Sequence, residues 1–296
     1  LAYLGVLTHP VLDWMNTYGM RWWLPFHGGW SYGDALFIVD PWIWLGLGGA
    51  LFLGLGARHT AWWLGFWGVA TALVLSAPVP GAAKVAWSVG LGGVLVARAA
   101  GVPGRHGATA PTGPGGDRPG GSGRDGSEGL ALWASLGAVA YVAVMVGLDL
   151  VGRRAAYRAL QETEASAVLE LVVAPLPADP FAGEIVARTP EGDLHGRIRW
   201  TPVPRVELFQ RTPMPAVRPG PGVEPTTAGR AASVARAVPR VEDYLVWSRL
   251  PTYEVTAVEG GWRVRVGDAR YPGVEGGGLG GPTVDLDERY RVRGVR

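Results

Sequence analysis

Four long apolar runs in the first half of the chain limit what this sequence can fold into. They cover residues 41–57, 60–77, 81–97 and 130–148, and Lys84 is the one charged side chain within them. Each run approaches the ~20 apolar residues that a helix needs to cross a hydrocarbon core. Four such runs cannot all be buried in the core of a soluble protein, because too few polar helix faces remain to cover them. We therefore expect an α-helical integral membrane domain, in which tryptophans near the ends of several runs act as interfacial anchors.

The second half of the chain has a different pattern. Short stretches of alternating or β-branched residues follow one another between Pro, Gly and Asp, for example EIVART, LHGRIRW, YEVTAV and WRVRVG. This pattern is typical of an antiparallel β-rich domain. The stretch VPRVEDYLVWSRL has helical spacing, and residues 213–232 have the composition of a loop.

These patterns divide the chain into four parts. We expect residues 1–100 to form a membrane domain, followed by a flexible loop rich in Gly and Pro at residues 101–129. Residues 130–150 are expected to be the last transmembrane helix, continued by a short helix to about residue 164. The β-rich extramembrane C-terminal domain, of α+β class, covers residues 151–296, which is the size of an independent fold.

Composition limits the partners and sites. The net charge of +2 is the small difference between 27 basic and 25 acidic side chains, so no nucleic-acid partner is expected. The chain has no cysteine, which excludes disulfides and thiolate metal ligands. A metal ion would therefore be held by His, Asp or Glu. The first residue is Leu1 and not Met, so we expect the natural start to lie upstream.

His9 and Asp13 stand four residues apart in the apolar stretch THPVLDWMN. If residues 1–18 form one helix, His9, Asp13 and Asn16 share one face. An ionised carboxylate in an apolar environment is costly unless it is paired or binds a cation, and a His and an Asp one turn apart can share a divalent metal such as zinc. One alternative is a hydrogen bond that satisfies both side chains. In another, Pro10 starts a new helix with His9 as its cap, which weakens the argument for a shared face.

Three further candidate residues follow in the aromatic segment 20–42. Asp40 directly precedes an apolar run, so its carboxylate either caps the helix that begins there or faces the same polar pocket as Asp13. His27 is followed by two glycines and could approach a ligand, and the alternative is an ordinary loop residue. Asp34 lies between them without a spacing that assigns it a role.

The same part of the chain resembles a known family. LTHPVLDWMNTYG, LPF and LFIVDPW occur in the order and spacing of a pattern of bacterial inner-membrane proteins that are described as LexA-binding, metal-dependent hydrolases. The stretches APLPADPFAGEIVARTPEG, YLVWSRLPTYEV and VGDARY are similar to longer members. The sequence departs from the pattern at Pro10, which replaces an aliphatic residue, and in the absence of an upstream histidine-bearing element.

The resemblance implies an integral inner-membrane protein, a divalent metal and hydrolysis of an unidentified substrate. Further metal ligands would come from the upstream element. The candidate metal ligands in this chain are His9, Asp13 and Asp40. The candidate supporting residues around them are Asn16, His27 and Asp34, of which the last two match the pattern poorly.

The expected function is a membrane-bound hydrolase that uses a divalent metal, zinc in the first instance, to activate a water for attack on an ester or phosphoester. The alternative is a non-catalytic membrane scaffold or regulatory protein that binds a protein partner through its C-terminal domain. Both predict a multi-pass protein of the bacterial inner membrane, in contact with the lipid bilayer. Arg153, Arg154 and Arg158 follow the last apolar run and favour a cytoplasmic C-terminal domain.

Overall fold

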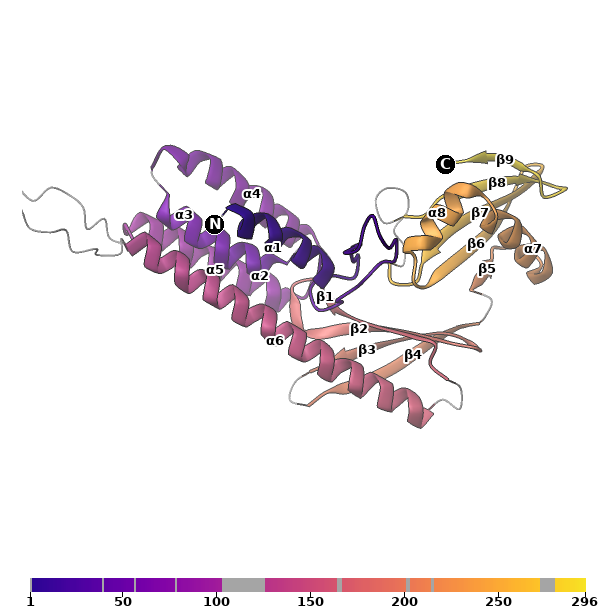
Figure 1. The fold of residues 1–296 in the computed structure, drawn as a ribbon, viewed down its shortest axis with the longest axis horizontal. Helices are drawn as coiled ribbons and strands as arrows, with labels where there is room; N and C mark the ends of the chain where they lie inside the picture. Colours follow the sequence, from indigo (N-terminus) through magenta and orange to yellow (C-terminus); the bar gives the residue numbers. More distant parts are fainter. Residues whose placement is uncertain are drawn as a thin grey trace, which may run out of the picture. The chain divides into compact units, whose positions relative to one another are not determined.

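The computed structural model describes residues 2–38, 40–55, 57–77, 79–102, 126–163, 167–200, 203–213, 216–271 and 280–296. The chain divides into two compact units, and Figure 1 labels the helices and strands of both. The first unit contains Leu1–Leu36, Leu148–Pro175 and Phe181–Arg296, and the second contains Phe37–Gly147 and Leu176–Pro180. Residues 1–36 group with the β-rich part of the chain, whereas the sequence predicts one membrane domain over residues 1–100.

The second unit is built from apolar helices. Helix α2 (Pro41–Ile43) continues through a π-helical turn (Trp44–Gly48) into α3 (Gly49–Gly54), and a 3-10 turn (Ala57–His59), α4 (Thr60–Ser76) and α5 (Gly81–Ala99) follow. Their buried core is largely aromatic and consists of Phe52, Trp67, Ala70, Val74, Trp87 and Leu91. Arg98 donates to the carbonyls of Leu53 and Leu55 at 3.2 and 2.7 Å, which satisfies acceptors that the end of α3 leaves free.

Two helices are long and apolar enough to cross a membrane. They are α5 and the Glu128–Thr163 part of α6 (Gly126–Thr163). Only 11% and 6% of their most apolar windows are buried, so most of their apolar surface is not packed in a protein core. The first two predicted spans correspond to shorter apolar helices, Pro41–Gly54 and Thr60–Ser76. Length and composition therefore support two of the four predicted spans.

The first β-sheet belongs to the C-terminal half of the chain. Its strand order is β1-β2-β3-β4, with bounds Glu170–Leu176, Asp179–Thr189, Gly192–Arg199 and Arg205–Pro213. Strand β3 pairs antiparallel with both β2 and β4. The C-terminal part of α6 packs on this sheet through Leu160, which lies against Ala187 and Leu194. The indole of Trp200 donates to the carbonyl of Leu148 at 2.7 Å and ties the residue after β3 to the same helix.

The second sheet has the order β5-β6-β7-β8-β9. Its strands are Val217–Pro219, Pro251–Val258, Gly261–Asp268, Thr283–Asp287 and Val292–Val295, and all neighbours are antiparallel except β5 and β6. Helices α7 (Pro225–Arg236) and α8 (Pro239–Trp247) belong to the same part of the chain (Figure 1). Alternate residues such as Val264 and Val266 point into a core that α7 closes with small side chains, because residues two apart on a strand share one face.

The helices and the two sheets confirm the α+β character of the C-terminal part, and α8 confirms the helix predicted from its spacing. Two predicted boundaries were wrong. The loop predicted at residues 213–232 contains β5 and most of α7, whose proline at the first turn and four buried alanines on one face favour a helix: Ala228, Ala231, Ala232 and Ala235. The loop predicted at residues 101–129 ends earlier because α6 begins at Gly126, and residues 103–125 lie outside the described part of the chain.

Candidate functional site

Residues 16–36, called the N-terminal segment from here on, follow helix α1 (Ala2–Met15). Asn16 ends the helix, because its side-chain oxygen accepts hydrogen bonds from the backbone N–H groups of Tyr18 and Gly19 at 2.7 and 3.2 Å. Gly19 has a φ of 75°, and a Cβ at this position would lie 2.3 Å from the ring of Tyr32. The turn therefore requires glycine.

The N-terminal segment leaves the end of α1 and returns to it. Met20 and Ser31 exchange two backbone hydrogen bonds of 2.9 Å, which close a loop between them. The N–H groups of Ala35 and Leu36 then donate to the carbonyl of Met15 at 2.8 and 2.9 Å. These bonds hold both ends of the segment, so its side chains occupy defined positions.

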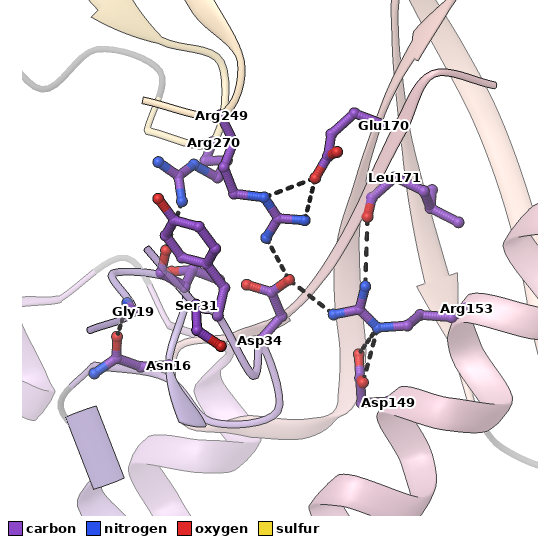
Figure 2. A network of polar contacts seen from close by, with 12 residues as sticks. Asn16, Gly19, Ser31, Asp34, Asp149, Arg153, Glu170, Leu171, Arg249 and Arg270 are labelled. Atoms are coloured by element: carbon purple, nitrogen blue, oxygen red, sulfur yellow. Dashed lines mark hydrogen bonds and ion pairs between the residues drawn. The ribbon is translucent and has the colours of Figure 1, made fainter. Parts of the chain in front are cut away.

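Asp34 is the centre of an ion-pair junction in the first unit (Figure 2). Its side chain is fully buried, and one carboxylate oxygen accepts from Arg153 at 2.7 Å and from Arg249 at 2.6 Å. Arg153 comes from α6, and Arg249 lies between α8 and β6. Asp34 has a φ of 54°, a left-handed conformation that aspartate tolerates better than most residues. The strained backbone is thus held where one carboxylate meets two guanidinium groups.

Each arginine of the junction also binds a second carboxylate, as Figure 2 shows. Arg153 donates to both oxygens of Asp149 at 2.9 and 2.8 Å, and Arg249 donates to Glu170 at 2.8 Å. Because a buried charge is costly unless it is paired, this alternation of charges stabilises all five groups together. Asp149 directly follows the apolar run 130–148. The junction therefore binds the N-terminal segment to the part of α6 that belongs to the first unit.

A second polar centre surrounds Arg270, whose side chain is 1% exposed. The guanidinium lies over three aromatic rings, at 5.0 Å from Tyr32, 4.8 Å from Trp247 and 5.3 Å from Tyr271. It pairs with Asp268 at 2.8 Å and donates to the backbone carbonyl of Thr17 at 2.7 Å. Desolvated cation–π contacts of this kind are favourable. Arg270 thus connects the C-terminal part directly to the N-terminal segment.

Two more hydrogen bonds join the same parts. The indole of Trp247 donates to the carbonyl of Tyr18 at 2.9 Å, and the hydroxyl of Tyr32 donates to the carbonyl of Trp247 at 2.6 Å. Asp268 holds the guanidinium of Arg270 in this position through their ion pair. Burial alone would raise the pKa of Asp268, but the hydrogen bonds and charge of Arg270 outweigh burial and hold that pKa below its usual value. Asp268 is therefore ionised and paired at neutral pH.

Tyr32 gives this centre a measurable pH dependence. Burial raises the pKa of the Tyr32 hydroxyl from 10.0 to about 12, although the charges of Arg270 and Arg249 lower it. The neutral Tyr32 hydroxyl therefore contributes its full stabilisation below pH 10, and this contribution is lost as the pH rises toward 12. We expect Tyr32→Phe to lessen the fall in the free energy of unfolding over this range, measured by denaturant titration. The exposed Tyr3→Phe should keep the wild-type slope, and equal slopes for both variants would contradict the assignment.

The structure places His9 and Asp13 as the spacing predicts. Helix α1 continues through Pro10, and the His9 Nε2 atom lies 3.3 Å from the Asp13 Oδ2 atom. Their side chains are 82% and 48% exposed, so the pair lies open at the surface of the described part of the chain. Asn16 is used in the turn described above. His27 accepts a hydrogen bond from the N–H of Gly29 at 3.1 Å in an exposed loop.

Asp40 caps helix α2, which is the first of the two roles predicted for it. One oxygen accepts from the N–H groups of Trp42 and Ile43 at 2.9 and 3.1 Å, and the other accepts from the hydroxyl of Tyr141 at 2.8 Å. Both oxygens are therefore engaged within the second unit. A pocket shared with Asp13 stays a prediction.

A catalytic zinc usually has three protein ligands. Among the residues that the structure describes, no three His, Asp or Glu side chains gather as a metal-binding group. The His9 and Asp13 pair supplies two ligands, which does not fit such a site, and we derive no hydrolytic step from it. The metal role of His9, Asp13 and Asp40 stays a prediction.

The sequence predicted little of the ion-pair junction and of the second polar centre around Arg270. Glu170, Arg249 and Arg270 were not singled out, and Arg153 was used only as a marker of membrane orientation. A signal was nevertheless present, because the C-terminal stretches YLVWSRLPTYEV and VGDARY hold Trp247, Arg249, Asp268 and Arg270. The stretches quoted for the resemblance in the two halves of the chain contact one another in the first unit.

Comparison with known proteins supports the N-terminal part of this picture. Residues 1–83 match the YdjM inner membrane protein family. The YdjM match includes α1, the N-terminal segment and α4, and it ends within α5. No curated protein and no solved structure matches the chain significantly. The match and the two apolar helices point to an inner-membrane protein, while hydrolase activity and metal binding have no support from the comparison.

Proposed function

We propose that the protein is a non-catalytic inner-membrane platform, whose N-terminal segment holds the β-rich part in a fixed orientation so that it can bind a protein partner. One observation carries this proposal. Two buried acceptors of the segment are bonded to residues far along the chain: the Asp34 Oδ2 atom accepts from Arg249, and the Thr17 carbonyl accepts from Arg270. Buried ion pairs between residues far apart in the sequence, such as Asp34 with Arg249, are suited to holding parts of the chain together.

The membrane side of the proposal rests on α5, α6 and the YdjM match. We place the β-rich part on the cytoplasmic side, because Arg153, Arg154 and Arg158 follow the last apolar run and positive residues close to a span favour that side. Of these three, Arg153 is bound to Asp149 and Asp34, so its charge is partly balanced. Arg154 and Arg158 carry most of the argument for orientation.

Metal-dependent hydrolysis of an ester or phosphoester is the second candidate function. It is favoured by the 3.3 Å approach of the His9 and Asp13 side chains on an exposed helix face. The pair can offer two ligands to a divalent ion such as zinc, and the chemistry that such an ion supplies is activation of a bound water. Further ligands would have to come from elsewhere.

One preparation separates the two functions. The full chain and His9→Ala are purified in detergent, and bound zinc, manganese and other divalent ions are measured together with hydrolysis of generic esters and phosphoesters. The platform predicts no stoichiometric metal and equal, background hydrolysis for both proteins. Metal that is lost with His9→Ala, together with hydrolysis that falls with it, would overturn the platform. Protease added to right-side-out vesicles should spare the β-rich part, and its digestion there would reverse the orientation.

A further inference from the structure

The loop between Met20 and Ser31 ends in an exposed apolar turn. Residues 22–26, Trp-Trp-Leu-Pro-Phe, are called the aromatic tip from here on. Trp23 is 68% exposed and Phe26 is 92% exposed, and Trp22 and Leu24 are also exposed. Large apolar side chains that gather in one exposed turn mark a surface that contacts a membrane or another protein.

The aromatic tip is held in place from its base. Besides the two hydrogen bonds between Met20 and Ser31, the indole of Trp14 donates to the Ser31 hydroxyl at 2.8 Å. The ring of Trp22 meets that of Trp14 edge to face at 6.2 Å, and the N–H of His27 donates to the carbonyl of Trp23 at 2.8 Å. The tip is therefore a formed turn, and its exposure is a property of the fold.

The base of this loop is fixed to the end of a membrane-spanning helix. Asp34 follows Ser31 by three residues and binds Arg153 at 2.7 Å. Arg153 lies on α6 shortly after the apolar run 130–148, where the first charged residues mark the membrane edge. The bonds within the first unit thus hold the loop at the level where lipid headgroups meet the hydrocarbon.

The chemistry of the loop matches that level. Trp and Phe side chains favour the boundary between headgroups and hydrocarbon. Residues 20–33 contain no acidic side chain, and the positively charged Arg21 directly precedes the tip, which suits a surface with anionic lipids. We propose that the aromatic tip inserts into the lipid interface and so anchors the first unit to the bilayer at a second point besides α6. This inference rests on the membrane placement in the proposed function, and not on its platform role.

The absence of cysteine makes a direct test possible. The single cysteine of Phe26→Cys carries a fluorophore that reports polarity, and the full chain is reconstituted in vesicles of phosphatidylethanolamine with a minority of phosphatidylglycerol. Phe209→Cys, at an exposed position on β4, is the matched control. Because both side chains are exposed, neither substitution removes a packed group.

We expect the label at residue 26 to emit at shorter wavelength than the label at residue 209. Lipids with a quencher just below the headgroup should quench it, and aqueous iodide should not. A label at residue 26 that behaves like the control, with iodide quenching and no lipid quenching, would overturn the proposal. So would a shift to shorter wavelength without lipid quenching, because a second copy or another protein would then cover the tip. Hydrolase activity, which would refute the platform, leaves these readings unchanged.

Discussion

Replacing Arg270 by alanine should lower the free energy of unfolding by about 3–5 kcal/mol, because it leaves a buried charge without its partner. Asp268 is buried and pairs with Arg270 at 2.8 Å, and the substitution removes the guanidinium of this pair. The substitution also removes the hydrogen bond to the Thr17 carbonyl and empties the space between three aromatic rings. Denaturant unfolding of the full chain in detergent, followed by tryptophan fluorescence, measures the loss.

Arg265→Ala is the matched control for this substitution. Arg265 lies on β7, the strand that ends shortly before Arg270, is exposed and pairs with Glu254 at 3.4 Å. Exposed ion pairs contribute at most about 1 kcal/mol, so this variant should unfold close to the wild type. If both variants lost the same free energy of unfolding, the burial of Arg270 would not account for the loss, which would contradict the prediction.

The second large effect is expected for Asp34→Asn. Asparagine has nearly the same volume and also tolerates the positive φ of this position, so the substitution removes the charge and little else. Arg153 and Arg249 would lose their shared carboxylate but keep Asp149 and Glu170. We therefore expect a loss of about 3 kcal/mol, at the low end for a broken buried pair.

Denaturant unfolding under the same conditions measures this loss too. Asp243→Asn on α8 is the control, since this carboxylate is exposed and its substitution should change stability by no more than about 0.5 kcal/mol. If Asp34→Asn proved as stable as Asp243→Asn, the junction would not depend on the charge of Asp34. The N-terminal segment would then be held by its backbone bonds and by Arg270.

Local patterns in the sequence predicted most elements of the fold. Alternation predicted strands such as β6 and β7, and spacing predicted α8, because both signals depend only on neighbouring residues. Helix α7 was not predicted, because its alanines and threonines give little hydrophobic periodicity. Besides its local signals, the helix is stabilised by packing of its alanine face on the second sheet, which is a tertiary effect.

The candidate site could be predicted only where its residues are close in sequence. The approach of His9 and Asp13 follows from one helical turn, and the cap at Asp40 follows from the proline after it. Asp34 instead meets partners 119 and 215 residues away, and no local spacing rule reaches that far. The role of Asp34 could therefore not be predicted from the sequence, although its contacts connect the segment to distant parts of the chain.

Hydrogen–deuterium exchange across residues 16–36 tests the central claim most directly, namely that this segment is locked onto the β-rich part. In the full chain, the N–H groups of Met20, Ser31 and Ala35 are hydrogen-bonded. We expect peptides from the segment to exchange as slowly as those from β6 and β7, and Arg270→Ala to speed exchange in the segment. Fast exchange in the wild type, or exchange that Arg270→Ala leaves unchanged, would contradict the lock.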